Sequence, residues 1–447
     1  MGLSRFGLQA TVSVVVICLC AISLTVSQEC RDYGEDGRHC IDSFDELPQD
    51  NIEVNFKLYT RKHRNGVDME FSSALHADFQ FGKPIKFITH GFLSKGSEDW
   101  VKQIADELLK VGDFNVIVVD WEKAADPDTD LKWVEYDEAS SNTRIVASRI
   151  KRLLGFILRQ SGSSALNDVH LIGHSLGAQI SGMVGKLIQR DIHCNGAPCK
   201  AARITALDPA RPNFLIDAGE RRRAPGPHCV SRDDAIFVDV IHSDAKEQDD
   251  HTGGTFPQLG IYQALGHADF YPNGGNKQPG CILFPCDHGR ATSLFAASIN
   301  SHCSFISETC SGSLALQNKR CSGCTSTPCQ RMGYHAIKPS TPTLYYLETT
   351  GDEPFCDFTV VDEATRTLVS SSPRPGKAVG VVSHMIATAG LARLLNARTG
   401  ARMPRRATSA EVTSETRFTK QVNFCSSVTQ TALAAVWSLP NFYRWLR

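Results

Sequence analysis

A pentapeptide of the form Gly-x-Ser-x-Gly, GHSLG, occupies residues 173–177. The apolar residues 169–172 precede it, and residues 179–188, which are rich in small side chains, follow it in a helix-like pattern. A glycine on each side of a serine suits a cramped strand-to-helix turn that leaves the hydroxyl exposed at the edge of a sheet. The motif is short, but in this context it predicts that Ser175 is a nucleophile.

A serine hydroxyl becomes an effective nucleophile when a histidine accepts its proton and a carboxylate orients that histidine. With this motif, the acid and then the histidine follow the serine along the chain. Asp208 ends an apolar segment, and Pro209 stops the strand there, so the carboxylate is predicted at the sheet edge. Asp239 and Asp244 are the alternative acids, which we interpret as a mid-strand carboxylate and a loop cap.

Fifteen histidines are candidates for the base. His288 directly precedes the helix-like residues 291–299, far enough along the chain to return to the edge of the sheet. His174 is next to the serine but points away on such a turn, and we interpret His242 and His267 as structural. His288 is therefore the predicted base.

An oxyanion hole needs two aligned backbone N–H groups, one of them from the residue after the nucleophile. Leu176 supplies that donor. Phe92, just beyond the apolar residues 84–89, supplies the second, and Gly91 before it permits a close approach. The alternative interpretation of Gly91 is a simple glycine turn.

Short apolar segments alternate with helix-like ones, including the amphipathic residues 138–160. Strands that alternate with helices favour a largely parallel sheet with helices on its faces. The predicted fold class is therefore α/β, an α/β-hydrolase with a mostly parallel central sheet flanked by helices and followed by a poorly defined C-terminal tail. The predicted strands are residues 84–89, 115–120, 169–172, 203–207 and 235–241.

Three regions are predicted along the 447 residues. Residues 1–27 carry an arginine, an apolar run and then small residues, the pattern of a secretory signal peptide, so we expect a secreted, extracellular protein. Residues 28–357 form the hydrolase domain. Residues 358–447 form a weakly structured basic tail, because residues 361–447 hold twelve Lys and Arg against four Asp and Glu, a net charge of +8. A sharper alternative is that residues 393–406 dock on anionic lipid.

Sixteen cysteines are present, and fourteen remain once the predicted signal peptide, with two of them, is removed. An even number in an oxidising compartment favours disulfides. The spacing of Cys321, Cys324 and Cys329 also suggests a zinc site, which we consider the weaker interpretation in a secreted chain.

These residues resemble the pancreatic lipase family. The matching segments occur in the family's order over residues 30–356. They are GKP (82–84), FITHGF (87–92), VDW (119–121), GHSLGA (173–178), LDPA (207–210), DVIH (239–242), GH (266–267), FYPNGG (270–275), PGC (279–281) and CDH (286–288).

The resemblance implies a secreted hydrolase of carboxylic esters of lipids, either a triacylglycerol lipase or a phospholipase A1, acting through an acyl-enzyme. It implies a catalytic triad of Ser175, Asp208 and His288. It also implies oxyanion donors at Phe92 and Leu176. The partner implied is a lipid ester at a lipid–water interface, on a membrane or lipoprotein surface, and no nucleic acid is expected.

The resemblance further assigns Tyr136 to the lining of the acyl pocket. It implies several disulfides, and an insertion after the nucleophile adds a cysteine pair of its own. The expected pairs are Cys30–Cys40, Cys194–Cys199, Cys281–Cys286, Cys310–Cys321 and Cys324–Cys329, which leave Cys229, Cys303, Cys356 and Cys425 without a partner evident from the sequence.

The chain departs from the family pattern in ways that limit cofactors and partners. The family's calcium-ligand pattern survives only at Asp234, so we expect no metal and no cofactor. The C-terminal β-sandwich that binds colipase is not recognisable. Residues 345–352 resemble its first strand at most, which makes colipase an unlikely partner.

Two loops bear on access to the site. Only four residues separate Cys281 from Cys286, too few for the family's lid, which predicts little interfacial activation. Residues 243–265 form a longer loop that is able to cover the site instead. A short lid favours phospholipase A1 activity and the long loop does not, so we expect a dual lipase and phospholipase. The alternatives are a catalytically silent lipid-binding or storage protein, and a small-ester carboxylesterase or serine peptidase.

Overall fold

The structure is a computed structural model that describes residues 30–36, 38–40, 48–69, 78–126, 135–217, 223–245, 258–322, 324 and 329–356. These residues belong to one compact unit of the chain, residues 1–368. The predicted signal peptide (1–27) and the predicted basic tail (358–447) lie outside the described residues. Among the helices that are described, none has both the length and the apolar character needed to span a membrane.

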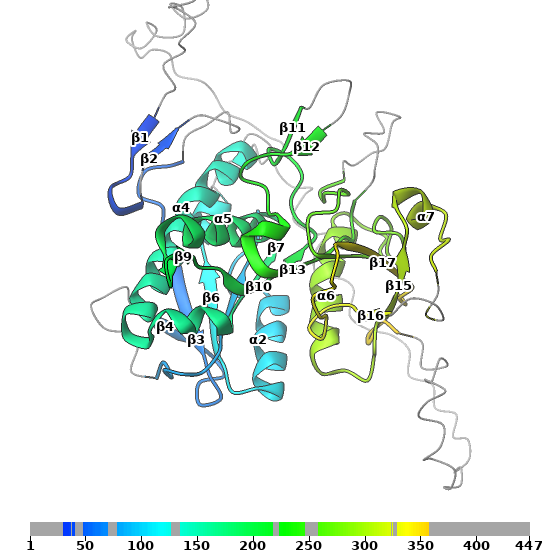
Figure 1. The fold of residues 1–447 in the computed structure, drawn as a ribbon, viewed down its shortest axis with the longest axis horizontal. Coiled ribbons are helices and arrows are strands. Elements are labelled where there is room, and N and C mark those ends of the chain that lie inside the picture. Colours follow the sequence, from blue (N-terminus) through cyan, green and yellow to red (C-terminus); the bar gives the residue numbers. More distant parts are fainter. Residues whose placement is uncertain are drawn as a thin grey trace, which may run out of the picture. The chain divides into compact units, whose positions relative to one another are not determined.

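A large mixed sheet forms the centre of the described part of the chain (Figure 1). The seven neighbouring strands from β17 to β6 run parallel, and two antiparallel strands extend each edge. In spatial order the strands are β16 (Gln330–Arg331), β15 (Ile306–Cys310), β17 (Thr343–Leu347), β14 (Ala268–Pro272), β13 (Ala235–Ile241), β10 (Ala201–Leu207), β7 (Val169–His174), β5 (Ile85–Thr89), β6 (Asn115–Asp120), β3 (Asn55–Tyr59) and β4 (Val67–Met69).

Helices cover both faces of this sheet (Figure 1). The helices α4 (Glu135–Ser161) and α5 (Leu176–Asp191) bury their apolar residues in one cluster with the sheet. The helices α2 (Asp99–Val111) and α6 (Cys286–Asn300) do so in a second cluster. Each face of a parallel sheet is thus buried, which explains why its strands are almost wholly apolar.

Smaller elements surround this core. Among the described residues, three short antiparallel hairpins lie outside the main sheet. The remaining elements are β1 (Cys30–Asp32), η1 (Gly34–Asp36), β2 (Arg38–Cys40), α3 (Glu122–Ala125), η2 (Ser163–Asp168), β8 (His193–Cys194), β9 (Ala197–Pro198), β11 (Leu215–Asp217), β12 (Arg223–Pro225), η3 (Arg232–Asp234) and α7 (Ser313–Gln317).

The predicted α/β fold class is confirmed. All five predicted strands are present as β5, β6, β7, β10 and β13, and all lie in the parallel part of the sheet. The amphipathic residues 138–160 lie within α4. The carboxyl ends of these parallel strands lie along one edge of the sheet. Ligand sites form at that edge in open α/β sheets.

One prediction about the C-terminal side was wrong. Residues 345–352 begin in β17, which pairs in parallel with β14 and antiparallel with β15 in the central sheet. The segment is therefore part of the hydrolase core and not the first strand of a separate β-sandwich. A buried strand carries no local signal for which sheet it joins, because that depends on distant partners, and Thr343 of β17 pairs with Ala268 of β14.

The cysteines pair largely as the sequence predicted. Cys30 lies opposite Cys40 in the β1–β2 hairpin and is disulfide-bonded. The pairing of Cys303 with Cys356 is new, and Cys425 lies outside the described residues. Cys229 is a buried thiol, and burial raises its pKa to about 12. The other disulfides are Cys194–Cys199, Cys281–Cys286, Cys310–Cys321 and Cys324–Cys329.

Candidate active site

Ser175 occupies a strained turn between β7 and α5. Its φ of 56° and ψ of −120° lie outside the regions favoured by residues with a side chain. A Cβ atom at Gly173 would lie 2.0 Å from the Gly177 carbonyl oxygen, and one at Gly177 would lie 2.1 Å from the Thr89 carbonyl oxygen. Both glycines of the motif are therefore required sterically, and the turn has the geometry that a nucleophile elbow needs.

Gly91 packs directly against this serine. A Cβ atom at position 91 would lie 2.7 Å from the Cβ of Ser175 and 3.2 Å from its Oγ. The chain after β5 therefore lies against the hydroxyl at a distance that only glycine allows. This contact shows the close approach that was expected at Gly91, and the part of the Phe92 N–H in an oxyanion hole stays a prediction.

Asp208 and His288 form a buried pair at the same edge of the sheet. The His288 Nδ1 lies 2.5 Å from the Asp208 Oδ2, and the two side chains are 7% and 0% exposed. The other carboxylate oxygen, Oδ1, accepts hydrogen bonds from the backbone N–H groups of Ser243 (2.7 Å) and Asp244 (3.1 Å). Two amides therefore hold the carboxylate while its free oxygen faces the imidazole.

Backbone geometry explains the position of Asp208. The Asp208 N–H donates to the Ile241 carbonyl at 2.8 Å, and the residue then turns with a φ of 42°. Aspartate tolerates this left-handed conformation better than most residues. The Ser175 N–H donates to the Leu207 carbonyl at 3.0 Å, so β10 brings nucleophile and acid to adjacent strand ends.

Asp244 lies closer to this pair than the sequence indicated. Oxygen or nitrogen atoms of Asp208, Asp244 and His288 all lie within 4.8 Å of one another. The Asp244 Oδ2 accepts a hydrogen bond from the Leu259 N–H at 3.2 Å, which agrees with a loop cap. Burial, together with the nearby charge of Asp208, raises the pKa of Asp244 to about 7. Asp244 is thus a second carboxyl group in the site, neutral below that pH.

Asp239, the other alternative acid, forms a structural ion pair with Arg203. Its carboxylate binds the Arg203 guanidinium through two bonds of 2.7 and 2.9 Å, and it accepts the Thr205 hydroxyl at 3.0 Å. The Arg203 side chain also donates to the backbone carbonyls of Gly333 and Tyr334. This network connects β10 and β13 to residues 333 and 334, which precede β17. Asp239 is therefore not part of the candidate active site.

His174 contacts the backbone and the ring of the predicted base, His288. Its Nε2 lies 3.1 Å from the His288 carbonyl oxygen, and the two rings lie 4.6 Å apart between centroids. Burial, with a smaller contribution from His288, lowers the pKa of His174 well below its ordinary value. A neutral His174 with its proton on Nε2 therefore donates to the backbone of His288. The sequence indicated only that His174 points away from Ser175.

The two predicted oxyanion donors, Leu176 and Phe92, directly follow Ser175 and the Gly91 that packs against it. Leu176 is the first residue of α5, so its N–H has no partner within the helix. The loop that carries Phe92 is fixed by His90, whose Nδ1 lies 3.0 Å from the Gly91 carbonyl oxygen. The Trp121 indole N–H donates to the His90 carbonyl at 3.0 Å. His90 and Trp121 therefore fix the loop that carries the second predicted donor. In the sequence these two residues stand out only because they lie in segments that match the family.

Tyr136 lies next to this loop. Its ring meets that of Phe92 edge to face, with 5.2 Å between centroids. The Tyr136 hydroxyl donates to the Pro212 carbonyl at 3.3 Å, and burial raises the pKa of the hydroxyl above its ordinary value. The half-buried aromatic pair forms an apolar wall beside the segment that packs on Ser175.

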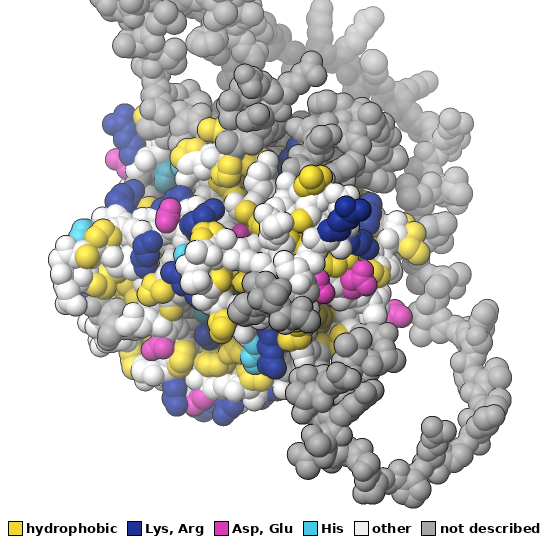
Figure 2. All heavy atoms as spheres, turned by 45° about the vertical axis from the view of Figure 1, so that its right-hand side comes forward, with side chains coloured by type: hydrophobic (Ala, Val, Ile, Leu, Met, Phe, Trp, Pro, Cys, Tyr) yellow, Lys and Arg dark blue, Asp and Glu magenta, His cyan; other side chains and the backbone are white. Residues whose placement is uncertain are grey.

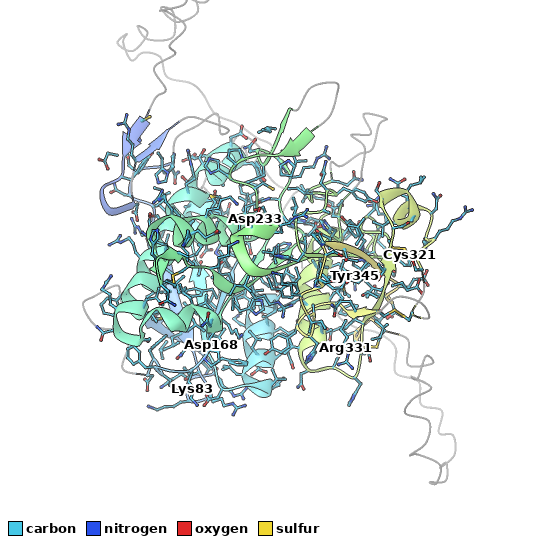
Figure 3. All side chains as sticks on the ribbon, in the orientation of Figure 1. Lys83, Asp168, Asp233, Cys321, Arg331 and Tyr345 are labelled. Atoms are coloured by element: carbon cyan, nitrogen blue, oxygen red, sulfur yellow. A yellow bond between two sulfur atoms is a disulfide. The ribbon has the colours of Figure 1, made fainter. Side chains whose placement is uncertain are left out.

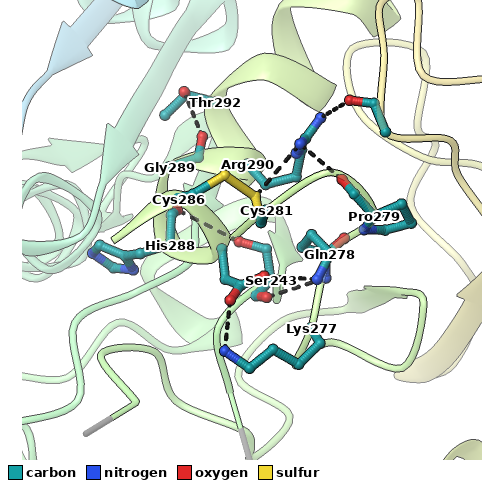
Figure 4. Close-up of a disulfide and its surroundings, with 12 residues drawn as sticks. Ser243, Lys277, Gln278, Pro279, Cys281, Cys286, His288, Gly289, Arg290 and Thr292 are labelled. Atoms are coloured by element: carbon teal, nitrogen blue, oxygen red, sulfur yellow. Dashed lines mark hydrogen bonds and ion pairs between the residues drawn. A yellow bond between two sulfur atoms is a disulfide. The ribbon is translucent and has the colours of Figure 1, made fainter. Parts of the chain in front are cut away.

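An apolar loop projects next to His288. The Cys281–Cys286 disulfide closes it, and α6, which carries His288, starts at its second cysteine. At its tip Ile282 is 92% and Leu283 79% exposed. Arg290 secures the base of the loop by donating to the Pro279 carbonyl, as Figure 4 shows, and it also donates to the Gly351 carbonyl. The loop is therefore short, anchored and apolar at its end.

The longer loop, residues 243–265, is described only at its two ends. Residues 246–257 lie outside the described residues. Gly260 packs on the predicted acid, because a Cβ atom there would lie 2.5 Å from the Asp208 Oδ1. The Arg211 N–H donates to the Leu259 carbonyl at 2.8 Å. The loop therefore leaves and rejoins the fold beside the site.

Asp234, the single residue left of the calcium-ligand pattern, is engaged by a lysine. The Lys186 ammonium lies 2.6 Å from the Asp234 Oδ2 and 2.8 Å from the Cys229 carbonyl oxygen. The carboxylate also accepts hydrogen bonds from the backbone and the hydroxyl of Ser231. An internal cation thus balances the charge of this buried aspartate.

A cavity of about 600 Å³ lies at the opposite end of the strands from Ser175. Lys83, just before β5, and Asp168, just before β7, line it and are labelled in Figure 3. Ser175 follows the other end of β7. This cavity is therefore separate from the candidate active site.

Known proteins similar to this chain were found by sequence and by structure. The sequence model of the Lipase family matches residues 27–355. Lipase member H of Mus musculus is 34% identical over 325 residues, which make up 68% of this chain and 64% of the relative. Pancreatic lipase-related protein 2 of Mus musculus is 32% identical over 332 residues, with coverage of 68% and 63%.

Inactive pancreatic lipase-related protein 1 of Canis lupus familiaris is 31% identical over 330 residues, with coverage of 68% and 64%. The chain therefore spans slightly less than two thirds of the length of these relatives. Among solved structures, Est1E from Butyrivibrio proteoclasticus is 13% identical, with a TM-score of 0.25, over 45% of this chain and 78% of that chain. Because the family match covers well over half of the 447 residues, the chain belongs to the Lipase family.

Proposed function

We propose that this protein is a secreted serine hydrolase that cleaves carboxylic esters of lipids. The observation that carries the proposal is the buried 2.5 Å contact between His288 and Asp208, at the sheet edge where Ser175 occupies the strained elbow. Structural histidine–carboxylate pairs are common, but this one lies at the strand ends that also hold the elbow. Membership of the Lipase family supports the same activity.

The proposed reaction passes through an acyl-enzyme. Ser175 Oγ attacks the ester carbonyl while His288 Nε2 accepts its proton and then delivers it to the leaving alcohol. Asp208 holds the His288 Nδ1 proton and stabilises the imidazolium. Water, activated by His288 in the same way, hydrolyses the acyl-serine and releases the fatty acid.

Two backbone amides stabilise the tetrahedral intermediate in this proposal. They are those of Leu176, at the start of α5, and Phe92, beside the Gly91 contact with Ser175. The partial positive charge at the start of the helix adds to the stabilisation of the developing oxyanion. The Phe92–Tyr136 pair would line the acyl chain.

A lipid surface is the partner that fits the apolar loop. Ile282 and Leu283 are almost fully exposed to water although both are large apolar side chains. Burying such a side chain is worth about 1.5–3 kcal/mol. Their position at the start of the helix that carries His288 would bring a lipid–water interface to the site, on a membrane or a lipoprotein.

Substrate preference follows from the same loop. A closed loop with four residues between its cysteines cannot cover Ser175, which favours access by phospholipids as well as triacylglycerols. We therefore propose dual triacylglycerol lipase and phospholipase A1 activity. The disulfides fit an oxidising compartment and support secretion.

The alternative is a catalytically silent lipid-binding protein on the same fold. One relative is named an inactive pancreatic lipase-related protein, so family membership alone does not establish turnover. The His288–Asp208 contact and the glycine against Ser175 favour an active site, because a binding protein has no need of either.

One set of assays separates these functions. The secreted protein and its Ser175→Ala variant are incubated with emulsified triacylglycerol, phosphatidylcholine vesicles and a short soluble ester. We expect fatty-acid release from both lipids by the wild type and none above background by the variant. Equal release by both proteins, or none by either, would refute the hydrolase; release from the soluble ester alone would refute the lipid substrate.

A further inference from the structure

A second cavity, of about 410 Å³, lies between α4, α5 and the N-terminal hairpin. Four of its lining side chains are lysine or arginine and two are histidine, while none is acidic. By contrast, side chains of both charges are interspersed over the face of the molecule that Figure 2 shows. The lining residues are Arg38, His39, Arg144, Ala147, Met183, Lys186, Leu187, Arg190, Pro227 and His228.

The cavity is built on rigid elements. Met183, Lys186, Leu187 and Arg190 follow the i, i+3, i+4, i+7 spacing of one face of α5. The hairpin on the opposite wall is fastened to α4 by an ion pair of 2.6 Å between Arg149 and Asp36. This pair also neutralises the buried aspartate at the base of the hairpin.

The cationic groups are not equally available. Lys186 and Arg190 already pair with aspartates outside the lining, through contacts of 2.6 Å each. The Arg38 side chain, which is exposed, makes no hydrogen bond or ion pair with the part of the chain that the structure describes. The Arg144 side chain, by contrast, is almost fully buried, and its Nε donates to the Ser141 carbonyl.

His39 lies partly buried in this cavity, and the Asp36 carbonyl and carboxylate only partly offset the effects that lower its pKa. Burial lowers the pKa of His39, and the charges of Arg144 and His228 lower it further. The His39 Nε2–H donates to the Asp36 carbonyl at 3.0 Å, so the neutral ring offers no second N–H to a ligand. The cationic donors of the cavity are therefore lysine and arginine side chains, and no acidic side chain is among its described lining residues.

We propose that this cavity binds a small phosphate-bearing molecule. Arginine and lysine side chains recognise tetrahedral oxyanions through short, charge-assisted hydrogen bonds. The volume falls in the range of small-molecule sites, and Ala147, Met183 and Leu187 provide an apolar wall for an organic group. A glycerol phosphate has this combination of groups.

The site is distinct from the catalytic one. Along α5 the lining residues begin at Met183, eight residues beyond Ser175, and end at Arg190, fifteen residues beyond it, which corresponds to roughly 12 to 22 Å along the helix axis. The reacting ester of a substrate at the elbow therefore lies outside the cavity. This distance favours a soluble ligand over the headgroup of a lipid being cleaved, and the proposal does not depend on hydrolase activity.

Binding of sn-glycerol 3-phosphate, inorganic phosphate and chloride to the full secreted chain, at constant ionic strength, tests the proposal by calorimetry. The test variant is Arg38→Gln with Arg190→Gln, and the matched control is Arg331→Gln on β16, away from the cavity. All three proteins keep the basic residues 361–447, so any binding by that region cancels in the comparison.

We expect saturable 1:1 binding of the phosphates, weakened roughly tenfold or more for each arginine removed, and unchanged in Arg331→Gln. Tighter binding of glycerol phosphate than of inorganic phosphate would support the proposal and identify an organic phosphate as the ligand. Equal binding of the two would also support it and would show that the phosphate group alone is recognised. Binding that is equal in all variants, or matched by chloride, would overturn it. Loss of binding to phosphatidic acid vesicles in the double variant, without any binding of glycerol phosphate by the wild type, would also overturn the proposal and would indicate a membrane surface instead.

Discussion

Replacement of Asp244 by asparagine tests whether this residue is a second buried acid and not the catalytic one. Asparagine has nearly the same shape, and its side-chain oxygen keeps the hydrogen bond from the Leu259 N–H, which is 3.2 Å long. The change removes only the ability to ionise within 4.8 Å of Asp208 and His288. Its effect on stability should therefore depend on pH.

The sign follows from the direction of the pKa shift. Burial and the charge of Asp208 raise the pKa of Asp244 from 3.8 to about 7. Between these values the folded chain holds a proton that the unfolded chain has lost, so the free energy of unfolding falls as the pH rises and levels off above about 7. Each pH unit in this window is worth about 1.4 kcal/mol. Between pH 5 and pH 8 the wild type should lose about 3 kcal/mol that Asp244→Asn does not lose.

Urea unfolding of the oxidised proteins at pH 5 and pH 8 measures this difference. Asp233→Asn is the matched control, because it makes the same chemical change on an exposed aspartate nearby in the chain. Asp244→Asn should also retain most of kcat on a soluble ester, whereas Asp208→Asn should lose on the order of 10⁴. Identical pH dependence in wild type and Asp244→Asn would refute the buried-acid assignment, and loss of activity in Asp244→Asn alone would transfer the catalytic role to it.

Four further results are expected. Ser175→Ala and His288→Ala should each reduce kcat by about 10⁴–10⁶, and the double variant should be little worse, since triad members act as a unit; multiplied losses in steady-state rates would contradict the triad. Ile282→Ser with Leu283→Ser should lower activity on emulsions tenfold or more, through lost interfacial binding, and spare activity on a soluble ester; an equal drop on both would place the loop in catalysis. Rates on tributyrin should rise smoothly through its solubility limit, and a sharp break there that is lost on deleting residues 247–256 would identify the long loop as a gate. EDTA should change neither activity nor melting temperature, because Lys186 balances Asp234; a fall restored by Ca²⁺ would refute this.

The parallel strands and the elbow could be predicted because their signals are local. A fully buried strand is a short apolar run, and the strand-to-helix turn at Ser175 needs glycines at fixed positions. Asp208 was predicted from the proline that follows it and from its place at a strand end. Each of these inferences used residues within a few positions of one another.

The remaining features depend on contacts between distant segments. His174 donates to the His288 carbonyl across 114 residues, and the local sequence shows only that it points away from the serine. Cys303 pairs with Cys356 over 53 residues, with no spacing to predict it. The strand β17 was misassigned for the same reason, because its partner β14 lies far away in the sequence.

Asp244 shows how such contacts change the chemistry of a residue. The local sequence predicts a loop cap, and the hydrogen bond from Leu259 agrees with that prediction. Two influences from distant segments raise its pKa. The first is burial of the carboxyl group away from water, and the second is the charge of Asp208, at the end of β10. The same residue is therefore both a structural cap and a titrating group of the site. A variant that separates the hydrogen bond from the charge, such as Asp244→Asn, can distinguish these two roles where the sequence cannot.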